Sequence, residues 1–241
     1  MIGPPRGPII LAPDDPPDAF PEPGHAMREP DGLLAVGGDL SSERLLAAYR
    51  RGIFPWFSDG EPILWWSPDP RCVFRPGQVR VARRLRRTLR SSPVRVRINT
   101  AFDDVITGCA GPRSYTEETW ITSEMKRAYC RLHTSGVAHS IEAWDGERLV
   151  GGLYGLAIGG VFFGESMFSA TRDASKIILV HLSRWLEKQK FGLIDCQVAS
   201  AHLISMGAIL MPRSDFVEEL GPLCARSHDR TLWESGREIG F

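Results

Sequence analysis

The sequence of 241 residues predicts an α+β fold, with a mixed, mostly antiparallel sheet preceded by a smaller N-terminal domain. Three apolar segments separated by glycine-containing turns, within residues 139–169, are typical of an antiparallel meander. The longest helical pattern, 173–190, is followed by a short apolar strand at 193–198. A tryptophan- and proline-rich stretch ends shortly before this part begins. We therefore predict domains at 1–70 and 71–241.

The N-terminal domain shows few regular patterns. Nine of the 18 prolines lie in residues 1–30, which predicts an extended lead-in and not a folded element. A short helix follows, with Ser41 as its N-cap and Gly52 at its end. The next segment, 55–71, contains three tryptophans among several prolines and predicts an irregular connection.

The second domain is expected to alternate helices and strands. The helix at 81–92 has only a thin apolar stripe, whereas the strand at 94–99 alternates cleanly. The further expected elements are helix 123–136 capped by Ser123, strands 139–144, 148–158 and 161–169, helix 173–190, strand 193–198, helix 201–208, strand 209–213 and helix 215–227. This order resembles the GNAT-type N-acyltransferase fold, and fold alone does not set function.

A formal net charge of zero hides a basic segment. No global field favours nucleic acid or membrane, but ten arginines and no acid lie within residues 71–97. Arginines bind phosphates and aromatic side chains stack on unpaired bases, so helix 81–92 is a candidate RNA-binding surface. The alternative is a solvated helix face in a chain with 25 arginines and four lysines.

Cysteine and histidine spacing excludes several classes of protein. The cysteines are odd in number, five, and form no C-x-x-C, which argues against a disulfide framework and a zinc site and suits a reducing cytoplasm. The six histidines show no metal-binding spacing. No signal peptide and no segment of roughly 20 apolar residues is present, so we expect no membrane partner.

Glu165 is the only charged residue in the apolar stretch 159–169. Strict strand alternation would place it on one face with Val161, Phe163 and Met167. A buried carboxylate is costly unless it is paired or belongs to a site. Glu165 is therefore either a structural salt-bridge partner or part of a functional site.

Asp195 and Gln197 are two residues apart and predict a second polar pair on one strand face. A binding or catalytic site and a hydrogen-bonded structural pair are both open from the pattern alone. Cys196 points to the other side, which disfavours a thiol nucleophile with His202 as its base. In a GNAT-like sheet the strands that carry Glu165 and this pair are neighbours and splay apart, so their side chains are expected to converge on one cleft.

Two other functions are compatible with parts of the sequence. An acyl-CoA N-acyltransferase of this fold carries a Q/R-x-x-G-x-G/A turn at the start of the long helix, where backbone N–H groups bind pyrophosphate. The corresponding stretch, "SATRDASKIIL", contains no glycine, which argues against coenzyme A as the donor. A non-catalytic RNA-binding module would use the arginine helix but leave the polar residues of the cleft without a role.

Ordered motifs along nearly the whole chain resemble the bacterial leucyl/phenylalanyl-tRNA–protein transferase family. They are "GLLAVGGDLS", "AYRRGIFPWF", "ILWWSPDPR", "TWIT", "AHSIEAW", "LVGGLYG", "FFGESMFS", "ASK" and "LIDCQV…HLISMGA". The resemblance implies transfer of leucine or phenylalanine, and less readily methionine, from aminoacyl-tRNA to proteins with an N-terminal Arg or Lys, which marks those proteins for degradation. Because the donor is an activated ester, no ATP, metal or other cofactor is expected.

The resemblance also implies residue roles. Asp195 and Gln197 would be the catalytic pair, and Glu165 would help to bind the cationic acceptor. Residues expected near the 3′-terminal adenosine are Tyr49, Trp56 and Tyr129. Residues expected around the aminoacyl side chain are Leu153, Phe162, Met167, Leu179 and Ile194. Apart from the resemblance, the basic helix predicts that Arg83, Arg84 and Arg87 bind tRNA phosphates. Strict alternation places Val161, Phe163 and Met167 on the face of Glu165, and only Met167 is also among the residues expected around the aminoacyl side chain. A bulge near Gly164 would account for the difference between these two sets of residues.

Overall fold

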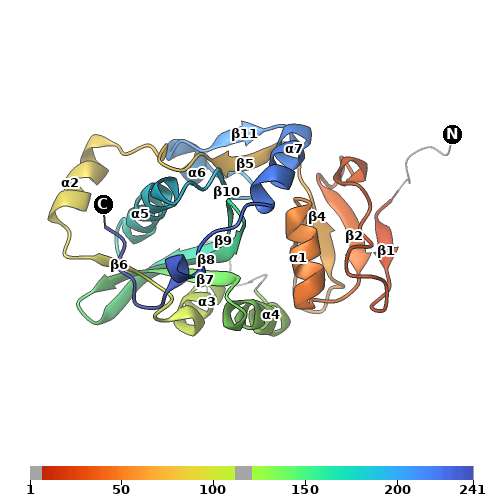
Figure 1. The fold of residues 1–241 in the computed structure, drawn as a ribbon, viewed down its shortest axis with the longest axis horizontal. Helices are drawn as coiled ribbons and strands as arrows, with labels where there is room; N and C mark the ends of the chain where they lie inside the picture. The colour runs from red at the N-terminus through yellow and green to blue at the C-terminus, as the bar shows by residue number, and fades with distance from the viewer. Residues whose placement is uncertain (1–6, 112–120, 241) are drawn as a thin grey trace.

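The computed structural model describes residues 7–111 and 121–240 and contains two β-sheets. A four-stranded sheet is built by the N-terminal part of the chain, and a seven-stranded sheet by the remainder (Figure 1). The predicted α+β class with a mixed sheet and an N-terminal domain is thereby confirmed. The first six residues of the lead-in and the start of the "TWIT" motif lie outside the described residues.

The N-terminal sheet has the strand order β1-β2-β4-β3. Its strands are β1 (Ile9–Leu11), β2 (Leu33–Gly37), β3 (Phe54–Pro55) and β4 (Leu64–Trp66), and a 3₁₀ turn, η1 (Pro23–His25), lies between the first two. Two predictions are wrong here. The lead-in contributes β1, which pairs in parallel with β2, and the tryptophan-rich segment contributes β3 and β4 to the sheet.

Arg44 explains why the proline-rich lead-in is ordered. Its guanidinium, 1% exposed, donates to the backbone carbonyls of Pro13, Asp15 and Pro16 and to the carboxylate of Asp39. Proline cannot donate a backbone hydrogen bond, but its carbonyl accepts one like any other. The partner that fixes the lead-in is thus about thirty residues away, where no local pattern indicates it.

The second sheet has the order β11-β5-β10-β9-β8-β7-β6. Its strands are β5 (Arg71–Phe74), β6 (Arg95–Ile98), β7 (Ala138–Asp145), β8 (Arg148–Ile158), β9 (Val161–Ser169), β10 (Leu193–Asp195) and β11 (Ile209–Met211). The β9–β10 pair is parallel and the other pairs of this sheet are antiparallel. The predicted meander corresponds to β7, β8 and β9.

The helices that the structure describes lie beside both sheets, and some of them cover the two faces of the second sheet. They are α1 (Ser42–Arg50), α2 (Arg83–Ser91), α3 (Phe102–Ala110), α4 (Ser123–Thr134), α5 (Ala174–Lys188), α6 (Ala201–Ser205) and α7 (Arg213–Cys224), followed by a 3₁₀ turn, η2 (Arg230–Trp233). Helix α5 packs on one face, and α3 and α4 pack on the other (Figure 1). The long helix buries ten of its 15 residues, and eight of these ten are apolar. In the part of the chain that the structure describes, no helix is long and apolar enough to cross a membrane.

Three element predictions differ from the structure. The N-cap of α4 is Thr122, not Ser123, and its hydroxyl accepts the N–H of Met125 at 3.2 Å. The strand predicted at 193–198 ends at Asp195. Helix α3 was not predicted, because its N-cap residue, Ala101, has no capping side chain. The Glu142 carboxylate of β7 accepts the Ala101 N–H at 2.8 Å instead, so the cap comes from a distant strand.

A bulge in β9 determines where Glu165 points. Tyr154 of β8 pairs with Ser166 and Gly155 pairs with Gly164, so Glu165 is the extra residue. The bulge predicted near Gly164 is confirmed. Gly155 is required opposite it, because a Cβ there would lie 2.2 Å from the Phe163 carbonyl oxygen.

The same bulge corrects the alternation argument. Val161 and Phe163 belong to the core on the α3–α4 face of the sheet, whereas Met167 packs against the core on the α5 face. One extra residue reverses the orientation of every side chain that follows it. The prediction that these three side chains share a face is therefore wrong for Met167.

Candidate active site

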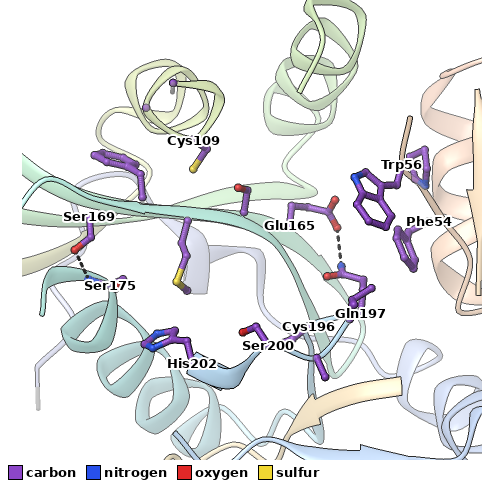
Figure 2. A pocket seen from close by; sticks show the side chains of 18 residues that line it. Phe54, Trp56, Cys109, Glu165, Ser169, Ser175, Cys196, Gln197, Ser200 and His202 are labelled. Carbon is purple, nitrogen blue, oxygen red and sulfur yellow. Dashed lines mark hydrogen bonds between the residues drawn. The ribbon is translucent and has the colours of Figure 1, made fainter. Parts of the chain in front are cut away.

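A cavity of about 860 Å³ lies where β9 and β10 separate. Their pairing ends at Asp195 opposite Phe163, and the chains diverge beyond this point. The resulting groove is lined by β3, α3, the end of β9 and the segment that follows β10 (Figure 2). We call it the catalytic groove. Its aromatic end carries Phe54 and Trp56, and its opposite end carries Ser169, Ser175 and His202.

Glu165 and Gln197 face each other across the catalytic groove. Gln197 Nε2 donates to Glu165 Oε1 at 3.1 Å. The two side chains lie closer to the aromatic end of the groove than to the end that carries Ser169 (Figure 2). Tyr129 donates its hydroxyl to Glu165 Oε2 at 2.8 Å, and the hydroxyls of Tyr129 and Tyr49 lie 2.5 Å apart. Helices α1 and α4 thus deliver two buried tyrosines to hold the carboxylate that the bulge turns out of the sheet.

The surroundings of Glu165 move its titration to neutral pH. Burial raises the pKa of this carboxyl to about 7, against hydrogen bonds from Tyr49 and Tyr129 that lower it. Burial, and then the charge of Glu165, raise the pKa of both tyrosines well above their usual range. The tyrosines therefore stay protonated as donors while Glu165 changes charge near neutral pH.

Asp195 lies behind the groove, not on its surface. Its side chain is fully buried and forms a bidentate ion pair with Arg71, at 2.8 Å from Nε and 2.7 Å from Nη2. The backbone N–H of Gln197 donates to Asp195 Oδ1 at 2.9 Å. This bond fixes Gln197 in a left-handed backbone conformation, with φ of 56°. Asp195 thereby orients the residue that faces Glu165.

Arg71 connects this carboxylate to the N-terminal part of the chain. Its guanidinium lies between the rings of Phe54 and Phe216, 4.8 and 4.6 Å from their centroids, and Nη1 donates to the Gly52 carbonyl at 3.1 Å. The cost of burying the Arg71 guanidinium is thus offset by an ion pair, a hydrogen bond to a carbonyl and two aromatic faces. Sequence reasoning missed this role because Arg71 was counted with the basic run that follows it.

Comparison with known proteins assigns the chain to a family. A family model described as leucyl/phenylalanyl-tRNA protein transferase matches residues 73–221, and a model of that family's N-terminal domain matches residues 38–69. The chain belongs to this family. A relative of that name from Azoarcus sp. is 59% identical over 198 residues, which cover 82% of this chain and 84% of the relative. A second, from Shewanella baltica, is 54% identical over 222 residues, 92% and 94% of the two chains.

Cys196 lines the groove but is a poor nucleophile. Burial raises the pKa of its thiol well above the usual range, and the negative charge of Asp195 raises it further. The thiolate is the reactive form of cysteine. The raised pKa therefore agrees with the prediction that Cys196 is not a nucleophile. Within the described residues, no group of three or more His, Cys, Asp or Glu is placed to hold a metal ion.

The expected aminoacyl-pocket residues lie on one side of the sheet. Met167 lines the groove directly. The other four are buried in the core against which Met167 packs, and they are Leu153, Phe162, Leu179 and Ile194. Met167 packs against this core and exposes its side chain to the groove.

The remaining expected residues divide into buried and exposed. Tyr49 and Tyr129 are fully buried and reach the groove only through Glu165. Trp56 is 43% exposed at the aromatic end, and Trp66 Nε1 donates to its carbonyl oxygen at 2.7 Å. The arginines expected to bind phosphates are exposed on α2, whose only buried residue is Leu85. A helix with so little apolar contact presents its charges to solvent.

Proposed function

We propose that this chain transfers leucine or phenylalanine, and less readily methionine, from aminoacyl-tRNA to the N-terminal Arg or Lys of acceptor proteins, which marks them for degradation. The observation that carries the proposal is the Glu165–Gln197 pair on the wall of a groove that also carries Phe54, Trp56 and Met167, in a chain of this family. Within the described residues no lysine or arginine is bonded to this carboxylate, whose pKa is raised, so it is suited to receive a cationic side chain.

The reaction needs positioning more than strong acid–base chemistry. The α-amine nitrogen attacks the ester carbonyl carbon and forms the amide bond, and the bond from that carbon to the ribose oxygen breaks. The ribose oxygen takes up the proton that the amine loses and leaves as a hydroxyl. An α-amine of pKa about 7.7–8.0 is partly neutral at pH 7. Gln197 uses Nε2 on Glu165, which leaves its carbonyl oxygen to accept an N–H of the amine. Asp195 acts through the backbone of Gln197, and Glu165 binds the acceptor side chain.

The donor is assigned to the other surfaces of the groove. We place the aminoacyl side chain against Met167, with Leu153, Phe162, Leu179 and Ile194 behind it. A flexible thioether adapts to both leucine and phenylalanine. The terminal adenosine would stack on Trp56, near Tyr49 and Tyr129. Three exposed arginines of α2 would bind tRNA phosphates, namely Arg83, Arg84 and Arg87.

The architecture supports two further assignments. We propose that residues 71–241 form a GNAT-like catalytic domain and residues 1–70 a separate small domain. The parallel β9–β10 pair, which opens into the groove, supports the first, and the division into two sheets supports the second. A supply of charged tRNA and an odd number of cysteines without a C-x-x-C motif are consistent with action in the cytoplasm.

The proposal predicts transfer from a charged tRNA to a defined peptide. Incubation with leucyl-tRNA and a peptide that begins with Arg is expected to give a peptide extended by one leucine at its α-amine, detected by mass spectrometry. The same peptide with an acetylated N-terminus, and uncharged tRNA with free leucine, are the controls and should give no product. Absence of the extended peptide, or extension from an acyl-CoA instead, would reject the proposal.

A further inference from the structure

A second cavity, of about 460 Å³, opens beside the catalytic groove at the N-terminus of α5. It is lined by Arg84, Arg172, Asp173, Ser175, Lys176 and His202. Ser175 and His202 line the catalytic groove as well. They lie at the end of the groove opposite Trp56 (Figure 2). The two cavities are therefore adjacent, and the second lies at the end of the groove away from its aromatic end.

Cations dominate this second cavity. Lys176 Nζ is paired with Asp173 Oδ1 at 2.8 Å, whereas Arg84 and Arg172 form no ion pair with any residue in the described part of the chain. Asp173, the single carboxylate, has its pKa lowered first by the Lys176 hydrogen bond, and also by Arg172 and Arg84. The first turn of a 15-residue helix adds its positive dipole end. The cavity thus favours an anion.

His202 is an unsatisfied polar group at the junction of the two cavities. Its Nε2 is buried and has no hydrogen-bond partner within the described residues. Burial, and then the charge of Lys176, lower the pKa of the ring, so it is neutral in the empty cavity. Buried polar atoms without a partner are rare and call for an explanation. A ligand oxygen placed between Lys176 and His202 would supply one.

We propose that this second cavity binds an internucleotide phosphate of the unpaired 3′ end of tRNA, an assignment that rests on the proposed function. The acceptor is cationic and would be repelled here, whereas the donor is a polyanion. Arg84 also belongs to α2, so the cavity joins the basic helix surface to the catalytic groove. The 3′ strand then runs from α2 through this cavity towards Trp56, with its phosphate held by the forked donors of arginine.

The test compares donors with and without phosphates. The variant Arg172→Gln/Lys176→Gln is expected to raise KM for a phenylalanyl ester of the trinucleotide CCA roughly ten- to a hundredfold. Transfer from phenylalanyl-adenosine, which has no phosphate, should change less than about twofold. The control Arg148→Gln/Lys188→Gln removes two exposed positive charges outside both cavities and should leave both donors unchanged.

Binding of the uncharged CCA trinucleotide separates this inference from the proposed function. Titration calorimetry should show weaker binding to the Arg172→Gln/Lys176→Gln variant and a smaller dependence on salt, with unfolding temperatures equal to the parent. This result would support the phosphate site even if the parent transferred no amino acid. Equal losses with both ester donors, or trinucleotide affinity equal to that of the control, would overturn the inference.

Discussion

Replacement of Asp195 by alanine is expected to destabilise the protein by about 3–5 kcal/mol and to abolish detectable transfer. The substitution leaves the guanidinium of Arg71 buried without its carboxylate, and it removes the acceptor of the Gln197 N–H. Urea unfolding measures the first effect, and the leucyl-tRNA assay measures the second. A variant as stable as the parent would contradict the ion-pair account.

A double substitution separates the structural role of Asp195 from its role in positioning. Arg71→Met/Asp195→Leu removes both charges and keeps similar volumes, so most of the lost stability should return. Transfer should stay lost, because the backbone N–H of Gln197 then has no carboxylate to accept it. Recovery of transfer in the double variant would show that Asp195 serves only as a partner for Arg71.

Glu165→Gln is expected to lower transfer to an Arg-peptide roughly ten- to a hundredfold at pH 8, the effect of one lost charge-assisted contact. Because the pKa of Glu165 is about 7, the parent carboxyl is largely protonated at pH 6. The difference between parent and variant should therefore shrink at pH 6. Affinity for uncharged tRNA should be unchanged, since the donor surfaces are untouched. A variant that loses tRNA affinity equally would contradict the assignment of Glu165 to the acceptor.

The same residue makes stability depend on pH with a definite sign. The pKa of Glu165 rises from an unperturbed value of 4.5 to about 7 in the folded protein. The folded state therefore binds more protons between these values, and the contribution of Glu165 to stability falls as pH rises from about 4.5 to about 7. The Gln variant lacks this fall. We expect the parent to lose more stability than Glu165→Gln between pH 5 and pH 8 in urea unfolding, and identical pH profiles would contradict the raised pKa.

The parts of the fold that sequence predicted are those with local causes. The meander follows from alternation between glycine turns, and α1 has its own serine cap, whose hydroxyl accepts the Arg44 N–H. The parts that were missed depend on distant partners. Strand β1 needs β2 and Arg44, and α3 needs the Glu142 carboxylate of β7. No window of sequence contains both halves of these interactions.

In the candidate site, too, the features with local causes were predicted and those that depend on distant residues were missed. Glu165 and Gln197 were recognised because polar residues in apolar strands demand a partner or a role, and the structure brings them within hydrogen-bond distance. Gln197 and Asp195 were predicted to share one face of a strand. The strand ends at Asp195, Gln197 has a left-handed backbone conformation, and Arg71 holds Asp195 away from the groove. Sequence spacing carries no signal for an ion pair across 124 residues.

A crystal structure with a non-hydrolysable amide analogue of phenylalanyl-adenosine tests the central claim most directly. The claim is that the aminoacyl group meets the acceptor beside Glu165 and Gln197. We expect the phenyl ring against Met167, the adenine on Trp56, and the amide carbonyl carbon close to the Gln197 side chain, with the Glu165 carboxylate left open towards the acceptor. An analogue bound outside the catalytic groove, or one whose phenyl ring occupies the place of the acceptor at Glu165, would contradict the account.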